Sequence, residues 1–404
     1  MAEQHGKTLV PQIRFAGFTD PWEQRKLGEL FEESDERASD REILSVSVAN
    51  GIYPASESDR ETNPGASLAN YKIVHFGDVV YNSMRMWQGA VDASRYDGIV
   101  SPAYVVARPN SEVYARFFAR LLRQPMLLKQ YQQVSQGNSK DTQVLKFDDF
   151  ASIGISMPVS ENEQRQIGGF FDRLDSLITL HQRKYDKLCV LKKSMLDKMF
   201  PKGGSLYPEI RFAGFTDPWE QRKLGDILQE RNVRTSDFES NPIFSLTIED
   251  GITPKTDRYE RTSLITKTED LFKIVSPNEF VTNPMNLRFG AFGYNKNSLS
   301  VCVSGYYDVF SIDNDKCSGF WNSYFKTPVA LKRFDDAATG SLIEKRRVKY
   351  STLCQLIFLM PKGMGEKKQI GAFFDRLDSL ITLHQRKLEL LRNIKKSMLD
   401  KMFV

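Results

Sequence analysis

The chain has few of the residues on which redox and metal chemistry depend. It contains four cysteines and four histidines in 404 residues, and the cysteines form no C-x-x-C pair. Such sparse, unpaired cysteines are typical of the reducing cytosol, so we expect a cytoplasmic protein. The N-terminus lacks the apolar core of a signal peptide, and no run approaches the ~18 apolar residues of a membrane span. We therefore expect no membrane association.

The motifs of several enzyme classes are also missing. There is no G-x-x-x-x-G-K-[ST] phosphate loop, which argues against ATP hydrolysis. The Asn/Asp-Pro-Pro-aromatic motif of adenine methyltransferases is approached only by Asp20-Pro-Trp22, Asp217-Pro-Trp219 and Asn283-Pro-Met285, which lack the second proline. No Ser/His/Asp grouping is evident. We expect a non-catalytic chain without a metal or cofactor of its own.

The composition is that of a folded, mildly basic protein. Hydrophobic residues make up 41% and charged residues 26% of the chain, and 56 basic against 51 acidic residues give a net charge of +5. This charge is compatible with contacts to phosphate groups but does not require them. The length favours two to three domains.

The most informative feature present is an internal repeat. Residues 13–28 read IRFAGFTDPWEQRKLG, and residues 210–225 repeat them without a change. Residues 172–184 return as 375–387, and residues 192–200 return as 395–403. A duplicated chain forms two similar halves related by a pseudo-twofold, which suits a pseudo-twofold partner such as duplex DNA.

Each half reads as a mixed domain followed by a long helix. β-branched and aromatic runs such as ILSVSV, YKIVHF, DVVYNS and AYVVARP predict strands. Apolar residues at spacings of three and four then predict a coiled-coil-like helix of about five heptads, roughly 50 Å long. The predicted fold is α+β: two mixed α/β domains (residues 1–160 and, with a linker, 201–363) joined by two long antiparallel coiled-coil helices (residues 161–200 and 364–404).

A dimerisation coiled coil is the simpler interpretation of either helix alone. The placement of the helices argues against a dimerisation role, because each helix follows one copy of a globular domain. The pair would then act as a spacer.

Taken together, these motifs resemble the specificity (S) subunit of Type I restriction-modification enzymes. The likeness rests first on the repeated segments that open each domain (the openers, residues 14–28 and 211–225). It also rests on the segments that begin each long helix (the closers, residues 163–178 and 367–381) and on the internal blocks YNSMRMWQG and GIVSPAY. It covers nearly the whole chain. The second closer reads Glu366-Lys-Lys where the first reads Glu163-Gln-Arg, a mild departure at a helix start.

The resemblance implies a non-catalytic DNA reader. Each target-recognition domain would read one half of a bipartite sequence in double-stranded DNA, and the long helices would set the gap and dock two methyltransferase (M) subunits. S-adenosylmethionine would then be bound by the M subunits, which methylate a flipped adenine. ATP and Mg would be bound by the restriction (R) subunits. The alternatives are a coiled-coil protein scaffold without a DNA role and a self-sufficient nucleic-acid enzyme.

Comparison of the two halves suggests which residues read bases. The frame of Asn82, Met84, Gly89 and Ala90 matches Asn283, Met285, Gly290 and Ala291, whereas residues 85–88 (RMWQ) differ from residues 286–289 (NLRF). Arg, Asn and Gln can make bidentate contacts to guanine or adenine, so a constant frame with exchanged residues suits two readers of different half-sites. The candidates are Asn82, Arg85, Trp87, Gln88, Asn283, Asn286 and Arg288. The alternative is that the aromatic residues belong to the core and that the asparagines close turns.

A second candidate is the polar loop after the internal helix, aligned on Gly137 and Gly340. Its residues could contact phosphates and bases, although a basic run is also typical of a solvated surface. The candidates are Asn138, Lys140, Gln143, Lys345, Arg346 and Arg347.

The resemblance also assigns the docking and spacer role to equivalent positions of the two helices: Phe170, Leu174, Leu177, His181, Phe373, Leu377, Leu380 and His384. For His181 and His384, setting the coiled-coil register is favoured over metal binding, because no Cys, Asp or Glu cluster accompanies them.

Overall fold

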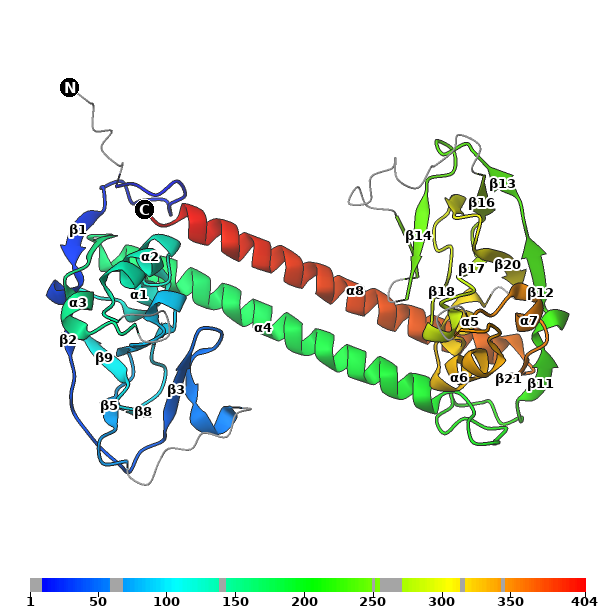
Figure 1. Ribbon diagram of the computed structural model, residues 1–404, viewed down its shortest axis with the longest axis horizontal. Helices are drawn as coiled ribbons and strands as arrows, with labels where there is room; N and C mark the ends of the chain where they lie inside the picture. The colour runs from blue at the N-terminus through cyan, green and yellow to red at the C-terminus, as the bar shows by residue number, and fades with distance from the viewer. Residues whose placement is uncertain are drawn as a thin grey trace. The chain divides into compact units, whose positions relative to one another are not determined.

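The computed structural model describes residues 9–58, 68–137, 143–248, 251–254, 271–312, 317–342 and 346–404 (Figure 1). They form two compact units. The first comprises Met1–Gln182 and Arg386–Val404, and the second comprises Arg183–Gln385. The predicted combination of mixed domains and two long helices is confirmed. Within the described residues, no helix is both long and apolar enough to cross a membrane.

The first unit is built on a four-stranded antiparallel sheet. Its order is β2 (Phe31–Glu33), β9 (Tyr104–Pro109), β6 (Val79–Asn82) and β7 (Val91–Ala93). Three smaller pairs accompany it: β1 (Glu23–Lys26) with β10 (Gly154–Met157), β3 (Leu44–Ser47) with β4 (Gly51–Pro54), and β5 (Lys72–Val74) with β8 (Gly98–Val100). Short 3-10 turns are η1 (Leu27–Glu29), η2 (Ala55–Glu57) and η3 (Met86–Gln88).

The second unit repeats this plan. Its four-stranded sheet runs β12 (Leu228–Arg231), β20 (Asp308–Ile312), β17 (Phe280–Thr282) and β18 (Phe292–Tyr294). Beside it are β11 (Glu220–Lys223) with β21 (Ile357–Met360), β14 (Phe244–Thr247) with β15 (Gly251–Pro254), and β13 (Arg234–Thr235) with β16 (Phe272–Val275) and β19 (Val301–Val303). The 3-10 turns are η4 (Leu224–Asp226) and η5 (Leu287–Phe289).

The helices follow the same order in both units. They are α1 (Ala115–Leu121), α2 (Pro125–Val134), α3 (Phe147–Ala151) and α4 (Glu161–Lys198), then α5 (Ser318–Tyr324), α6 (Pro328–Ala337), α7 (Tyr350–Leu353) and α8 (Met364–Lys401). Pro125 and Pro328 separate two helices in each unit and begin the second one. Proline suits a first helical position because the N–H it lacks has no partner there.

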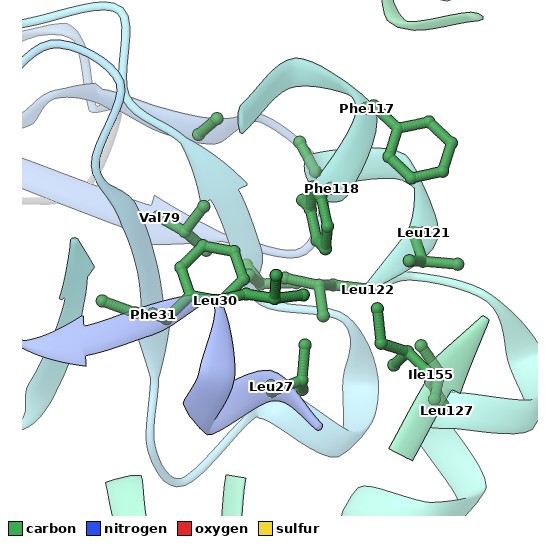
Figure 2. Close-up of a cluster of buried hydrophobic side chains, with 14 of the residues drawn as sticks. Leu27, Leu30, Phe31, Val79, Phe117, Phe118, Leu121, Leu122, Leu127 and Ile155 are labelled. Atoms are coloured by element: carbon green, nitrogen blue, oxygen red, sulfur yellow. The ribbon is translucent and has the colours of Figure 1, made fainter. Parts of the chain in front are cut away.

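The central sheet of the first unit is buried on both faces. Val79 and Tyr81 belong to the main core with the helices, whereas Val80 between them packs with Leu44 and Val74 of the smaller strand pairs. This alternation follows the two-residue period of a strand. In the main core, Phe31 and Phe118 meet edge to face with ring centroids 5.3 Å apart (Figure 2).

The ends of the long helices are exchanged between the units. Helix α4 begins in the first unit, but Phe200, just after its end, packs in the core of the second against Trp219 and Phe374. Helix α8 begins in the second unit, and Phe403 packs in the core of the first against Trp22 and Phe117. Each core therefore contains a residue from the other repeat's helix.

The repeated openers anchor the starts of the same helices. The Arg14 guanidinium donates two hydrogen bonds, 2.6 and 2.7 Å long, to the Glu163 carboxylate, and Trp22 Nε1 donates to Glu163 Oε1. Arg211 and Trp219 bind Glu366 in the same way. Both glutamates are buried, so loss of either arginine would leave a buried charge without its partner.

The two long helices run antiparallel where they meet within each unit. In the first unit, Lys395 Nζ lies 2.5 Å from Asp175 and Arg392 donates to Gln182. Residue numbers rise along α4 as they fall along α8, which defines the antiparallel register. In the second unit, Lys192 pairs with Asp378 at 2.6 Å.

We expect Phe403→Ala to destabilise the first unit by about 3–5 kcal/mol, because it removes a buried aromatic ring. Its matched variant, Phe200→Ala, should have the same effect on the second unit. Hydrogen exchange resolved by peptide distinguishes the units. Equal loss of protection in both units from either variant would contradict the exchange of helix ends.

Candidate nucleic-acid interface

The first predicted reading segment, residues 82–90, is a tight turn between strands β6 and β7. Asn82 Oδ1 accepts a hydrogen bond from the Met84 N–H at 3.0 Å, and the turn ends at Gly89 with φ +90°. In the second unit, Asn283 accepts from the Met285 N–H at 3.1 Å, and Gly290 has φ +95°. Both asparagines therefore close turns, the alternative raised from the sequence.

The two turns expose different side chains. Arg85 and Gln88 are exposed in the first, and Asn286 and Phe289 in the second. Trp87 is partly buried against the core, and its Nε1 donates to the Met84 carbonyl. Hydrogen-bonding groups on Arg85, Gln88 and Asn286 are thus placed where a nucleic acid could meet them.

Arg288 is held differently from Arg85. Its guanidinium lies over the Phe289 ring at 4.3 Å and pairs with Asp335 of α6 at 3.1 Å. Only 11% of the side chain is exposed. Its placement gives Arg288 a structural role in joining the turn to α6, and its contact with a base stays a prediction.

The second predicted segment lies against the first in each unit. Backbone hydrogen bonds between Gln136 and Val144 close the loop, and the Leu145 N–H donates to the Ser83 carbonyl at 2.9 Å. Thr339 and Arg347 close the equivalent loop, where the Val348 N–H donates to the Pro284 carbonyl at 2.8 Å. These bonds join Ser83 to Leu145 and Pro284 to Val348, and so they bring each turn next to the described ends of its loop.

The residues of this loop are divided between outward and inward positions. Arg347 is exposed, whereas Arg346 donates to the carbonyls of Asp335 and Ala338 and so caps the end of α6. Gln143 is partly exposed. Asn138, Lys140 and Lys345 lie outside the described residues. Lys146 and Lys349, which precede α3 and α7, are exposed beside the loops.

An acidic residue of each long helix anchors its domain by contacts that the sequence did not indicate. Asp172 binds Arg116, Arg120 and Arg95 at 2.7, 2.9 and 3.2 Å. Burial raises the pKa of Asp172, but the bonds to Arg116 and Arg120 outweigh burial and hold that pKa below its usual value. The identical Asp375 instead binds Tyr294 and Lys296. One helix sequence therefore accommodates two different domains.

The predicted docking residues fall into two groups. Leu174 and Leu377 are buried, and Phe170 and Phe373 are partly buried against their own domain cores. Leu177 and Leu380 are exposed, as are Leu180 and Leu383 one turn farther along. His181 and His384 are partly exposed, and their role in register stays a prediction. The described residues contain no group of three His, Cys, Asp or Glu side chains suited to a metal ion.

Comparison with known proteins identifies a family domain and a fold. Residues 19–189 match the model of the Type I restriction modification DNA specificity domain. No curated protein matches the chain. The S subunit of a Type I restriction-modification system from M. genitalium is similar over 98% of this chain and 99% of its own, with 13% identity and a TM-score of 0.56. The HsdS subunit from Thermoanaerobacter tengcongensis is similar over 96% of this chain and 98% of its own, with 16% identity and a TM-score of 0.43.

Proposed function

We propose that this chain is a specificity subunit of a Type I restriction-modification system and that it reads a bipartite DNA target with one domain for each half-site. The observation that carries the proposal is the duplicated scaffold. In each unit the turn lies beside the described ends of a polar loop, and the exposed side chains of the turn differ between the units. Because base edges differ in their donors and acceptors, different side chains select different half-sites.

The proposal assigns the chemistry to partner subunits. Two M subunits carrying S-adenosylmethionine would methylate adenine, and R subunits would use ATP and Mg. This chain would supply the DNA sequence preference and the docking surface, and its function requires no cofactor of its own.

Methylation mapping tests the two-reader proposal. The chain is expressed with its cognate M subunit in a host without adenine methylation, and N6-methyladenine is located by sequencing. We expect one bipartite motif with a fixed gap. A stable complex of the chain with M that neither methylates DNA nor shows salt-dependent affinity for it would instead indicate a protein scaffold.

Within that assay, Arg85→Ala should relax the half-site read by the first domain. Loss of one bidentate base contact costs about 1–3 kcal/mol of discrimination. Asn286→Ala, at the matching position of the second turn, should relax only the other half-site. Asn286 is preferred to Arg288 because loss of Arg288 would also remove the ion pair with Asp335. If either variant changed both half-sites equally, the assignment of one reader per domain would be wrong.

The long helices are proposed to set the gap between the half-sites. Insertion of four residues after Arg183 and after Arg386 lengthens each helix by about 6 Å, or about two base pairs of DNA. The insertions keep Asp175 with Lys395 and Lys192 with Asp378. We expect the mapped gap to lengthen while both half-sites stay the same. Insertion into one helix only is the control, and an unchanged gap in the double insertion would exclude a ruler role.

The exposed leucines are proposed to dock the M subunits. Leu177, Leu180, Leu380 and Leu383 are 36–46% exposed at equivalent positions of α4 and α8. Changing Leu177 and Leu180 to Asp should remove one of the two M subunits, because it places charge in an apolar contact. Thr179→Asp, an exposed change between them, is the control. Native mass spectrometry gives the stoichiometry, and retention of both M subunits would refute this docking site.

A further inference from the structure

Each unit contains a β-hairpin whose described tip residues are exposed, a feature that the sequence comparison did not single out. In the first unit, strands β3 and β4 pair from Leu44 with Pro54 to Ser47 with Gly51, which leaves residues 48–50 as the tip. Val48, Ala49 and Asn50 are all exposed, and Val48 is 44% exposed. In the second unit, β14 and β15 pair in the same register, and Ile248 at the start of the tip is 41% exposed.

The first hairpin is tied to the turn at residues 82–90 by Arg123. Arg123 Nε donates to the Val91 carbonyl at 2.9 Å, at the start of the strand that follows the turn. Its terminal nitrogen lies 3.4 and 3.3 Å from the carbonyls of Ser47 and Val48. One partly buried guanidinium therefore bridges the hairpin tip and the strand that leaves the turn.

Close packing also holds the base of this hairpin in place. Gly51 has φ +66°, and a Cβ added there would lie 2.0 Å from Asp92 Oδ2 on β7. Asp92 also pairs with Arg116 at 3.5 Å. Glycine is thus required at residue 51 both by its backbone conformation and by the approach of β7.

The second unit also brings the start of its tip close to its turn. A Cβ added at Gly290 would lie 3.8 Å from Ile248 Cγ2, so the tip residue lies beside the glycine that ends the turn. A Cβ at Gly251 would lie 3.5 Å from Gly293 on β18. The hairpin and the turn are therefore neighbours in both units.

The two hairpins share a frame but differ at the tip. Residues 43–54 read ILSVSVANGIYP and residues 243–254 read IFSLTIEDGITP, so Gly51-Ile52 matches Gly251-Ile252. At the aligned positions 48–50 and 248–250 the sequence changes from Val-Ala-Asn to Ile-Glu-Asp, of which residues 249–250 lie outside the described residues. This is the pattern already found in the turns, where a constant frame carries different exposed residues.

The chemistry of the tips suits base edges better than phosphates. Asn can bind adenine by two hydrogen bonds, and an aliphatic side chain can contact the thymine methyl group. None of the tip residues is basic, so the tips lack the side chains that make most phosphate contacts.

We propose that the described tip residues of the hairpins, 48–50 in the first unit and Ile248 in the second, belong to a third base-reading segment beside the turn and the loop of each domain. The inference rests on the proposed DNA-reading function and adds residues to its interface. In the first unit, Arg123 is a positioning residue that fixes the tip relative to the turn.

The test compares tip variants in the full complex of this chain with its M subunits, by methylation mapping. The first variant replaces residues 48–50 by Ile-Glu-Asp, the sequence at the aligned positions 248–250. The second is the milder Asn50→Ala. Asn162→Ala, which changes an exposed asparagine at the start of α4, is the control. Thermal unfolding of each complex establishes that the variants are folded.

We expect both tip variants to change discrimination by about tenfold or more at one or two adjacent positions of the first half-site. The second half-site and the gap should stay unchanged. A folded Asn50→Ala complex with an unaltered motif, or with equally reduced methylation at every site, would overturn the proposal. Failure of the unmodified complex to yield any bipartite motif would instead count against the proposed function. The experiment therefore distinguishes a failure of the hairpin proposal from a failure of the proposed function.

Discussion

Each domain core depends on an aromatic side chain delivered by the long helix of the other repeat. Phe200 and Phe403 lie just beyond the ends of α4 and α8 and are buried among the tryptophan and phenylalanine rings of the domain that the helix enters. The same helices are fixed at their starts by the buried Arg14–Glu163 and Arg211–Glu366 pairs. A helix fixed at both ends cannot shift along its axis without opening a core or breaking a buried ion pair. The openers and the helix ends, which supply these contacts, are among the segments that repeat almost without change.

The variable surfaces are built on that constant frame. Turn residues 82–90, the loop that follows α2 and the β3–β4 hairpin come from distant parts of the chain, but backbone hydrogen bonds and Arg123 hold them together. Because backbone groups make most of these links, the exposed side chains can differ without loss of the arrangement. The two units show this: Arg85 and Gln88 on one turn are replaced by Asn286 and Phe289 on the other.

Much of the fold could be predicted from the sequence, but less of the interface could. The predicted strands and long helices are present because their signals are local: two-residue and three-to-four-residue apolar periods, with glycine and proline at the boundaries. The same patterns did not reveal that Arg288 is paired with Asp335 or that Arg346 caps α6. Nor did they show that Leu174 and Leu377 are buried while Leu177 and Leu380 are exposed. Those outcomes depend on partners that lie far away along the chain.

The sequence by itself determined that the protein has two similar domains, each followed by a long helix, because nearly identical segments adopt the same local structure. It also indicated the frame of each turn, since glycine is favoured where φ is positive. Only the tertiary structure decided which core receives each helix end, which basic side chains face outward and which segments meet beside the turn. These are contacts between residues separated by tens to hundreds of positions, and no local pattern encodes which of the possible partners will be adjacent after folding.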